Sequence, residues 1–437
     1  MRNLRRGAWG SFLVASLLGA ALAGCKSVQA PPAPPRPVFY PFPPDPPRVQ
    51  YLTAINTARD VITSKRKWKF LDLIVGPPPD ILASSQAALT KPYGVAVWHG
   101  RIYVCDYGAR VVKVLDLERN KFYILGGDTP PTTAPTNLCI AADGYKFIVE
   151  SMPGLIQVFD ADDNYAGTFK VKDGRPAGAA AIGDELFVTD LTHDRIQVLD
   201  RKTGKLIRTL GSKGQGPGQL LMPNAITADA QGNLYVSDQM NFRFQKLDRT
   251  GKSLLSVGGA GDTYGKFARP RGIGVGPDEV IYVVESVYNV VQMFNQEGNV
   301  LMFFGNFQGA PGFLLLPASI AADKSCLEYF AKYVDPRFEA EYLLFVTSQV
   351  GDARLGVYAL GHLKPGAEIP PLAAPEAAPE AAPKPAPGPA AKPAPEAAPK
   401  PAPEAAAKPA PETAPEPAPE APLKPAPEAS SPAQKQP

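Results

Sequence analysis

A unit of forty-odd residues that begins with a proline recurs six times in the middle of this 437-residue chain. The repeated prolines are separated by 43, 41, 47, 47 and 47 residues, and they are Pro92, Pro135, Pro176, Pro223, Pro270 and Pro317. A period of this length with several short strands in each unit is typical of a β-propeller, in which every repeat forms one blade. The repeat therefore predicts an all-β fold with six blades.

Each unit has the sequence pattern of four strands. In the fourth unit, the run after Pro223 is small and apolar, "AQGN" is a turn, and "LYVSD" is a strand. The strand "FRFQKLD", the turn "RTGK" and the strand "SLLSVGG" follow. Gly and Asn suit the turns, and β-branched and aromatic residues suit the strands. We expect four-stranded antiparallel blades.

The sixth unit departs from this pattern in two ways. The segment "KSCLEYFAKYVDPRFEAE" (324–341) separates its first two strands, and we expect it to form a short helix on the rim. The unit also lacks an outer strand. Either "VQYLTAI" (49–55) or "KFLDLIVG" (69–76) could supply that strand and close the ring, so that no sheet edge stays open.

The repeats resemble the NHL family of six-bladed propellers. The matching features are Pro-x-Gly/Ala-Ile/Val, "GNLYVSD", Arg-x-Gln-x-Leu/Phe-Asp and a closing Gly-Gly. The resemblance implies a six-bladed propeller over residues 49–362. NHL repeats carry an Asp at the end of the second strand that braces the loop leading into the third. Asp190 with Arg195, and Asp238 with Arg243, fit this role.

The two flanks of the propeller have different compositions. Residues 1–24 have a basic start and a short apolar run, which is typical of an export signal. "LAGC" ends in Cys25 and resembles the lipobox of bacterial lipoproteins, which implies a diacylated Cys25 and a membrane anchor. Lys26 after the cysteine favours the outer membrane. Residues 25–48 form a proline-rich linker, in which Phe39, Tyr40 and Phe42 suggest packing on the domain.

Residues 363–437 are rich in Pro, Ala, Glu and Lys and contain too few large apolar residues to form a core, so we expect a disordered tail. The tail is similar to segments by which some envelope proteins cross the periplasm. Two alternatives stay open for it: contact with peptidoglycan or an envelope partner, and an inert solvated chain. Together the flanks predict a lipid-anchored protein of the bacterial cell envelope.

Charge and motif content exclude several functions. The net charge is +3, which gives no basic stripe for nucleic acid. His99, His193 and His362 are the three histidines, and they do not converge into a zinc site. Three cysteines follow Cys25, and the alternatives for them are one disulfide with a free thiol, or three free thiols: Cys105, Cys139 and Cys326. No catalytic residue or bound cofactor is assigned.

The topology of an up-and-down blade predicts which residues lie near the axis. Two and four residues after each proline stand small side chains, which suit the crowded centre of a ring. The second strand ends on the face where the first begins, so their ends share one face. The strand ends are Asp106, Glu150, Asp190, Asp238, Glu285 and Ser348. The residues after the prolines are Tyr93, Thr136, Ala177, Asn224, Arg271 and Ala318.

We expect this face, rimmed by five carboxylates and with His193 on an adjoining loop, to be the binding face. The carboxylates have two interpretations. In the first they brace loops, as in NHL repeats. In the second, Glu150, Glu285, Asn137 and Asn224 form an oxygen-rich cluster that holds a cation such as calcium.

These patterns support two classes of function. The first is a non-catalytic, lipid-anchored binding or scaffold module for a protein, peptide or glycan. The second is a calcium-dependent hydrolase or a lyase with its site at the channel mouth. A structural role in the envelope through the tail is a third hypothesis.

Overall fold

The computed structural model describes residues 37–42, 45–63, 82, 84–127 and 132–369. The expected signal segment, Cys25, the candidate strand 69–76 and the tail from residue 370 lie outside these ranges. No helix within the described ranges is long and apolar enough to cross a membrane. Three cysteines, Cys105, Cys139 and Cys326, are free thiols.

The described strands form six antiparallel sheets, and five of these sheets have four strands each. The first sheet consists of β3 (Pro92–Trp98), β4 (Arg101–Asp106), β5 (Val111–Asp116) and β6 (Lys121–Ile124). The second consists of β7 (Pro135–Ile140), β8 (Lys146–Glu150), β9 (Leu155–Phe159) and β10 (Tyr165–Lys170). The third consists of β11 (Pro176–Ile182), β12 (Glu185–Asp190), β13 (Arg195–Asp200) and β14 (Leu206–Leu210).

The next two sheets repeat this order, so that every repeated proline begins the first strand of a sheet. The fourth consists of β15 (Pro223–Ala228), β16 (Leu234–Asp238), β17 (Arg243–Leu247) and β18 (Ser253–Gly258). The fifth consists of β19 (Pro270–Val275), β20 (Ile281–Glu285), β21 (Val290–Phe294) and β22 (Val300–Phe304).

The sixth sheet has five strands, in the order β1-β2-β25-β24-β23. Its strands are β23 (Pro317–Asp323), β24 (Phe338–Ser348), β25 (Leu355–Leu363), β2 (Val49–Ile55) and β1 (Val38–Tyr40). The segment 49–55 therefore supplies the missing strand, as one of the two alternatives predicted. Residues 38–40, which were assigned to the linker, form the outermost strand β1. Phe39 and Tyr40 are buried, which confirms that this part of the linker packs on the domain.

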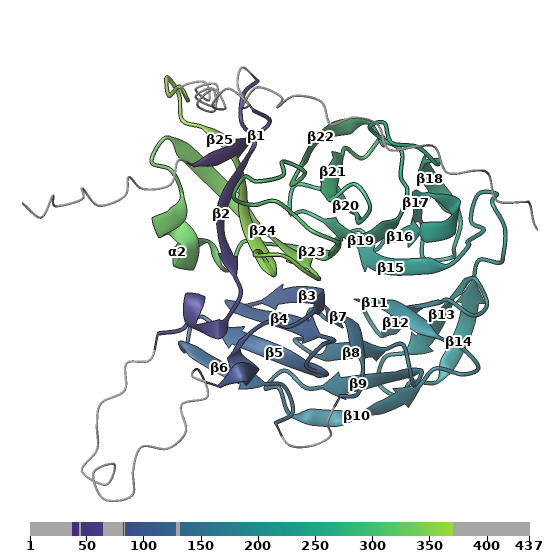
Figure 1. Ribbon diagram of the computed structural model, residues 1–437. Coiled ribbons are helices and arrows are strands. Elements are labelled where there is room, and N and C mark those ends of the chain that lie inside the picture. Colours follow the sequence, from purple (N-terminus) through teal and green to yellow (C-terminus); the bar gives the residue numbers. More distant parts are fainter. Residues whose placement is uncertain (1–36, 43–44, 64–81, 83, 128–131, 370–437) are drawn as a thin grey trace, which may run out of the picture. The chain divides into compact units, whose positions relative to one another are not determined.

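The first strands of the six sheets contact one another in a closed ring, in the order β3, β7, β11, β15, β19, β23 and back to β3 (Figure 1). These six sheets around one axis form a six-bladed β-propeller, as the repeat predicts. The apolar faces of neighbouring sheets pack together, and the largest buried cluster lies where the sixth sheet meets the first, which are the two ends of the ring. Closure therefore rests on apolar packing between segments far apart in the chain.

The first strands of neighbouring blades lie close together, because glycines in alternate blades face the backbone of the next blade. A Cβ atom on Gly272 would lie 2.6 Å from the Cα of Ser319, and one on Gly94 would lie 2.7 Å from the Cα of Asn137. The six residues four positions after the prolines line an axial cavity of about 300 Å³, as predicted: Ala96, Cys139, Ala180, Thr227, Gly274 and Ala321.

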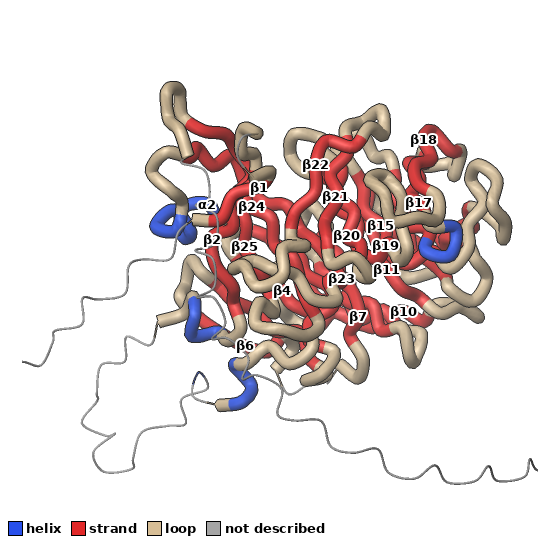
Figure 2. The backbone as a smooth tube through the Cα atoms, turned by 45° about the horizontal axis from the view of Figure 1, so that its top comes forward, coloured by secondary structure: helices blue, strands red, loops and turns tan. Residues whose placement is uncertain are grey.

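Helical segments are short and lie at the periphery of the sheets (Figure 2). α2 (Leu327–Phe330) and the 3₁₀ turn Ala331–Tyr333 form the helical insert predicted in the sixth unit. Phe330 of α2 packs into the core between the first and sixth sheets. Within the described ranges, the other 3₁₀ turns are Ala58–Asp60, Ser85–Ala87 and Gln239–Asn241.

Candidate binding site at the centre of one face

The five carboxylates at the ends of the second strands are fully buried. Each accepts hydrogen bonds from backbone N–H groups just before the proline of its own blade. Asp106 accepts from the N–H groups of Thr90 and Lys91, both at 2.8 Å, and Asp238 accepts from that of Leu221 at 2.6 Å. These contacts hold the loop that enters the blade, because a buried N–H group without a partner would be costly.

The two predicted Asp–Arg pairs brace the loop into the third strand as well. Nε of Arg195 lies 3.2 Å from Oδ2 of Asp190, and Nε of Arg243 lies 2.8 Å from Oδ2 of Asp238. His193 contacts the same carboxylate of Asp190 through Nδ1 at 3.0 Å. His193 therefore belongs to the bracing network and does not line the central pocket.

The environment shifts the pKa values of these carboxyl groups in both directions. Burial raises the pKa of Asp238 above its ordinary value despite hydrogen bonds from Asn241, Leu221 and Arg243. For Asp106, burial acts in the same direction, but the ammonium group of Lys113 and two backbone N–H groups outweigh it and hold the pKa below the ordinary value. Hydrogen bonds, including one from Gln197, likewise lower the pKa of Asp190 against the effect of burial.

Glu150 and Glu285 also bond to the backbone. Glu150 accepts from the N–H group of Thr133 at 2.8 Å, and Glu285 accepts from those of Ala268, Arg269 and Val287 at 2.8 to 3.0 Å. Asn137 and Asn224 line the central pocket, whereas the two glutamates do not. The structure thus does not bring the predicted oxygen-rich cluster together. Within the described ranges, no three His, Cys, Asp or Glu side chains are arranged to hold a metal ion.

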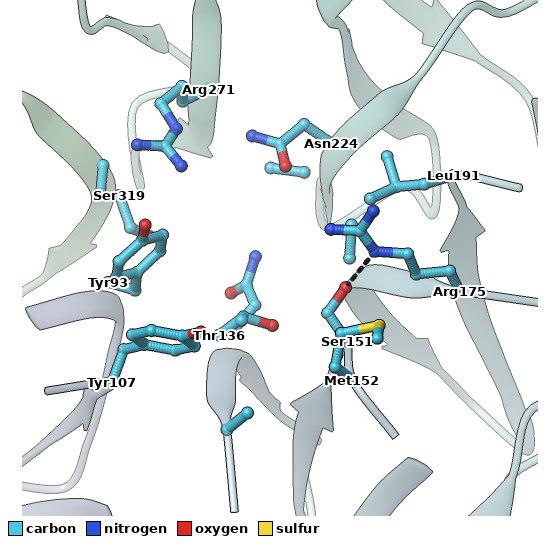
Figure 3. Close-up of a pocket in the computed structure, with 15 residues that line it drawn as sticks. Tyr93, Tyr107, Thr136, Ser151, Met152, Arg175, Leu191, Asn224, Arg271 and Ser319 are labelled. Carbon is cyan, nitrogen blue, oxygen red and sulfur yellow. Dashed lines mark hydrogen bonds between the residues drawn. The ribbon is translucent and has the colours of Figure 1, made fainter. Parts of the chain in front are cut away.

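A pocket of about 220 Å³ opens at the centre of the predicted face (Figure 3). In every blade the pairing of the first two strands shifts register just after the repeated proline. Such a bulge re-aims side chains and is common beside functional sites. Here it turns the residues after the prolines towards the axis, among them Tyr93, Asn224 and Arg271.

The pocket is cationic, which corrects the expectation of an acidic rim. Arg175 and Arg271 line it, and no Asp or Glu does. Nε of Arg175 donates to Oγ of Ser151 at 3.2 Å. The Arg271 guanidinium carbon lies 5.1 Å from the ring centre of Tyr93. Neither guanidinium has an ion-pair partner among the described side chains.

Aromatic and apolar side chains form another part of the wall. The rings of Tyr93 and Tyr107 lie 5.4 Å apart, and Nζ of Lys91 lies 5.9 Å from the centre of each. Tyr107 is 42% exposed and Met152 is 67% exposed. In Figure 3, Arg175 lies across the pocket from the two tyrosines.

Further exposed apolar residues surround the pocket on the same face. They occupy the loops that follow the second strands and the positions before the prolines, and they include Met222, Met240, Val287, Tyr288, Leu316 and Val350. Large apolar side chains gathered around a pocket are typical of a surface that contacts a partner.

Sequence reasoning identified some of these residues and missed others. The sequence analysis placed the residues directly after the prolines on this face, and three of them line the pocket: Tyr93, Asn224 and Arg271. Asn137 lines it as well. Arg175, Ser151, Met152 and Leu191 were missed. The position of Arg175 directly before Pro176 could have identified it as a pocket residue. The backbone N–H group of Arg175 donates to the bracing carboxylate of Asp190, which holds Arg175 at the same face.

One family model and several solved structures are similar to this chain, and the family model agrees with the six-bladed architecture. The model of the DUF5128 family, described as a 6-bladed beta-propeller, matches residues 179–259. A streptogramin B lyase structure is 17% identical, covering 62% of this chain and 83% of its own, with a TM-score of 0.43. Virginiamycin B lyase from Staphylococcus aureus is 18% identical, with coverages of 62% and 85% and a TM-score of 0.43. A structural genomics protein of unknown function from Bacteroides thetaiotaomicron is 15% identical, with coverages of 71% and 75% and a TM-score of 0.49.

Proposed function

We propose that the propeller is a binding module whose central pocket takes an acidic group of a protein, peptide or glycan partner. The observation that carries the proposal is the pair Arg175 and Arg271, which line one pocket without any carboxylate among its lining residues. Arginine suits this task because its planar guanidinium presents several donors to a carboxylate or phosphate. Two such groups facing one space repel each other, and an anion between them relieves that repulsion.

The exposed apolar residues around the pocket support a protein or peptide partner. Met152, Met222 and Leu316 lie at the edge of the face, where they could pack against apolar groups on either side of the acidic one. In this arrangement the pocket sets the position of the partner, and the rim adds buried apolar area. The proposal assigns no bond-breaking step to the site.

We also infer that the repeats are of the NHL type and that the propeller is anchored to the bacterial envelope, facing the periplasm or the cell surface of the outer membrane. The NHL inference is supported by the recurrence of the Asp–Arg brace in Asp190 with Arg195 and in Asp238 with Arg243. The anchor is supported by the lipobox-like residues before Cys25. Globomycin, which blocks cleavage of lipoprotein signals, should cause the precursor to accumulate; unchanged processing would exclude lipidation.

The tail after residue 363 is proposed to contact peptidoglycan or another envelope component. The proposal is supported by the composition of residues 370–437, in which lysines and glutamates stand among many prolines. Deleting residues 370–437 should reduce co-sedimentation of the protein with peptidoglycan, and it should leave anion binding at the central pocket unchanged. Full co-sedimentation of the truncated protein would exclude this role for the tail.

Citrate and inorganic phosphate are suitable first probes of the pocket. Isothermal titration of the full chain should detect binding that weakens as salt rises, because ions screen the attraction. The double variant Arg175→Gln and Arg271→Gln should lose this binding by at least tenfold. Arg59→Gln with Lys205→Gln removes the same charge from exposed residues outside the pocket and serves as the control. Equal loss in both variants would refute a specific anion pocket.

A further inference from the structure

The donors and the apolar groups of the pocket are not mixed evenly around it. Arg175, Asn224 and Arg271 come from three consecutive blades, the third, fourth and fifth. Tyr93 and Tyr107 come from the first blade, and Met152 comes from the second. In Figure 3, the side chains of Arg175 and Asn224 face the tyrosines across the open space. The pocket therefore has a donor side and an apolar side.

Most side-chain N–H groups that line the pocket are free to donate, both on the donor side and in Asn137 of the second blade. No side-chain hydrogen bond is made by Asn224 or Arg271 within the described part of the chain. Asn137 uses Oδ1 to accept from the N–H group of Leu138 at 2.8 Å, which leaves its NH₂ group free. An ionised carboxylate only accepts hydrogen bonds, with two oxygens and about four lone-pair sites, so it complements this set of donors.

The apolar side lies within reach of the same ligand. The Arg271 guanidinium is 5.1 Å from the ring of Tyr93, and that ring is 5.4 Å from the ring of Tyr107. A carboxylate bound by Arg271 would thus place the atoms next to it against the tyrosines. An inorganic anion would leave this wall in contact with water, whereas an apolar group attached close to the carboxylate would cover it.

We propose that the pocket recognises a carboxylate that carries an apolar or aromatic group within a few bonds, the chemistry of the C-terminal residue of a peptide chain. This inference rests on the proposed anion-binding function and specifies its ligand. The volume of about 220 Å³ is below the ~300–1,000 Å³ of pockets for drug-sized ligands, so it suits one terminal residue. The preceding residues of the chain would then cross the apolar rim, where Met222 and Leu316 are exposed.

Calorimetry on the full chain with matched probes tests the inference. N-acetylphenylalanine should bind at least tenfold more tightly than its amide and at least tenfold more tightly than acetate. A hexapeptide that ends in phenylalanine with a free carboxylate should bind at least as tightly as the single residue, and its amidated form should not. If N-acetylphenylalanine binds but the hexapeptide does not, the ligand is a small free acid with an apolar group and not the C-terminus of a peptide.

Two variants separate the parts of the pocket. Tyr107→Ala with Met152→Ala should bring N-acetylphenylalanine down to the affinity of acetate and leave acetate itself unchanged. Arg175→Gln with Arg271→Gln should abolish binding of both acids. Thermal midpoints equal to that of the unaltered chain would show that these substitutions leave the fold intact.

The outcomes distinguish the two proposals. If acetate, phosphate and N-acetylphenylalanine bind equally well in the unaltered chain, the pocket takes anions but the apolar requirement is wrong. If the amide binds as tightly as the acid, the carboxylate requirement is wrong. If citrate, phosphate and every acid all fail to bind, the proposed anion-binding function itself is refuted.

Discussion

Lys113 donates a hydrogen bond from Nζ to Oδ2 of Asp106 at 2.8 Å, and both side chains are fully buried. The third and fourth blades have a glutamine at the same register, and Gln197 and Gln245 contact their carboxylates at 3.0 and 3.4 Å. The first blade therefore uses an ion pair where these two blades use a neutral amide. Arg195 and Arg243 supply the cation for the carboxylates of the third and fourth blades, whereas Lys113 supplies it in the first.

Lys113→Met should strongly destabilise the propeller, because it leaves the carboxylate of Asp106 buried without its cation. Breaking a buried pair in this way costs about 3–5 kcal/mol. Lys113→Gln introduces the residue type found at this position in the third and fourth blades and keeps one hydrogen bond to Asp106, so it should cost about 1 kcal/mol less than Lys113→Met, the size of that hydrogen bond. Urea unfolding followed by tryptophan fluorescence measures both. Midpoints for both variants equal to that of the unaltered chain would show that the Lys113–Asp106 ion pair contributes nothing to stability.

The opposite pKa shifts of Asp106 and Asp238 predict opposite pH trends. The pKa of Asp106 is lowered in the fold, so its ionised form stabilises the protein above pH ~4, and this contribution is lost as the pH falls through the folded pKa. The pKa of Asp238 is raised, so its ionisation costs stability as the pH rises through the folded pKa.

Asn substitutions at the two positions test these signs. The stability lost in Asp106→Asn, relative to the unaltered chain, should shrink as the pH falls from 5 to 3. The loss in Asp238→Asn should shrink as the pH rises from 4 to 7. Urea midpoints at each pH provide the comparison, and parallel curves for both variants would contradict the assignment.

The fold was predictable from the sequence because the prolines recur at one position of the blade. Each proline begins the strand next to the axis, and turns rich in Gly and Asn separate the other strands. β1 was not predicted because three residues between prolines are too short to show the alternation that identifies a strand. Its position depends on pairing with β2, a contact that no local pattern records.

The site was predictable in position but not in charge. Topology placed the carboxylates and the post-proline residues on one face, and both are there. Sequence alternation does not reveal whether a side chain at a strand end meets solvent or a loop backbone. The carboxylates of Asp106 and Glu285 turn towards backbone N–H groups, which leaves Arg175 and Arg271 to set the charge of the pocket.

Ring closure by β2 predicts a sharp contrast between two substitutions in one strand. Ile55 is fully buried in the cluster between the sixth and first sheets, and Thr53 is half-buried. Ile55→Ala should cost about 2–5 kcal/mol, as expected when a large buried side chain is truncated. Thr53→Ala should cost less than about 1 kcal/mol. A small effect at Ile55 in thermal or urea unfolding would mean that β2 contributes little to closing the ring.

The alternate-blade glycines predict that one added methyl group disturbs the ring at Gly272 but not at Gly274. A Cβ atom on Gly272 would lie 2.6 Å from the Cα of Ser319 and 2.8 Å from the carbonyl oxygen of Ala318, which are backbone atoms of the next blade. Since no side-chain rotation relieves this contact, Gly272→Ala should lower the unfolding free energy by about 1–3 kcal/mol. A Cβ atom on Gly274 in the same strand meets its nearest atom, a methyl group of Ile320, at 3.3 Å. Gly274→Ala should therefore be close to neutral, because the neighbouring side chain can adjust and the unfolded chain loses entropy. Urea unfolding measures the stability of both variants. Equal stability would show that the inner strands β19 and β23 can move apart, so that the axial cavity is wider in solution than their packing implies.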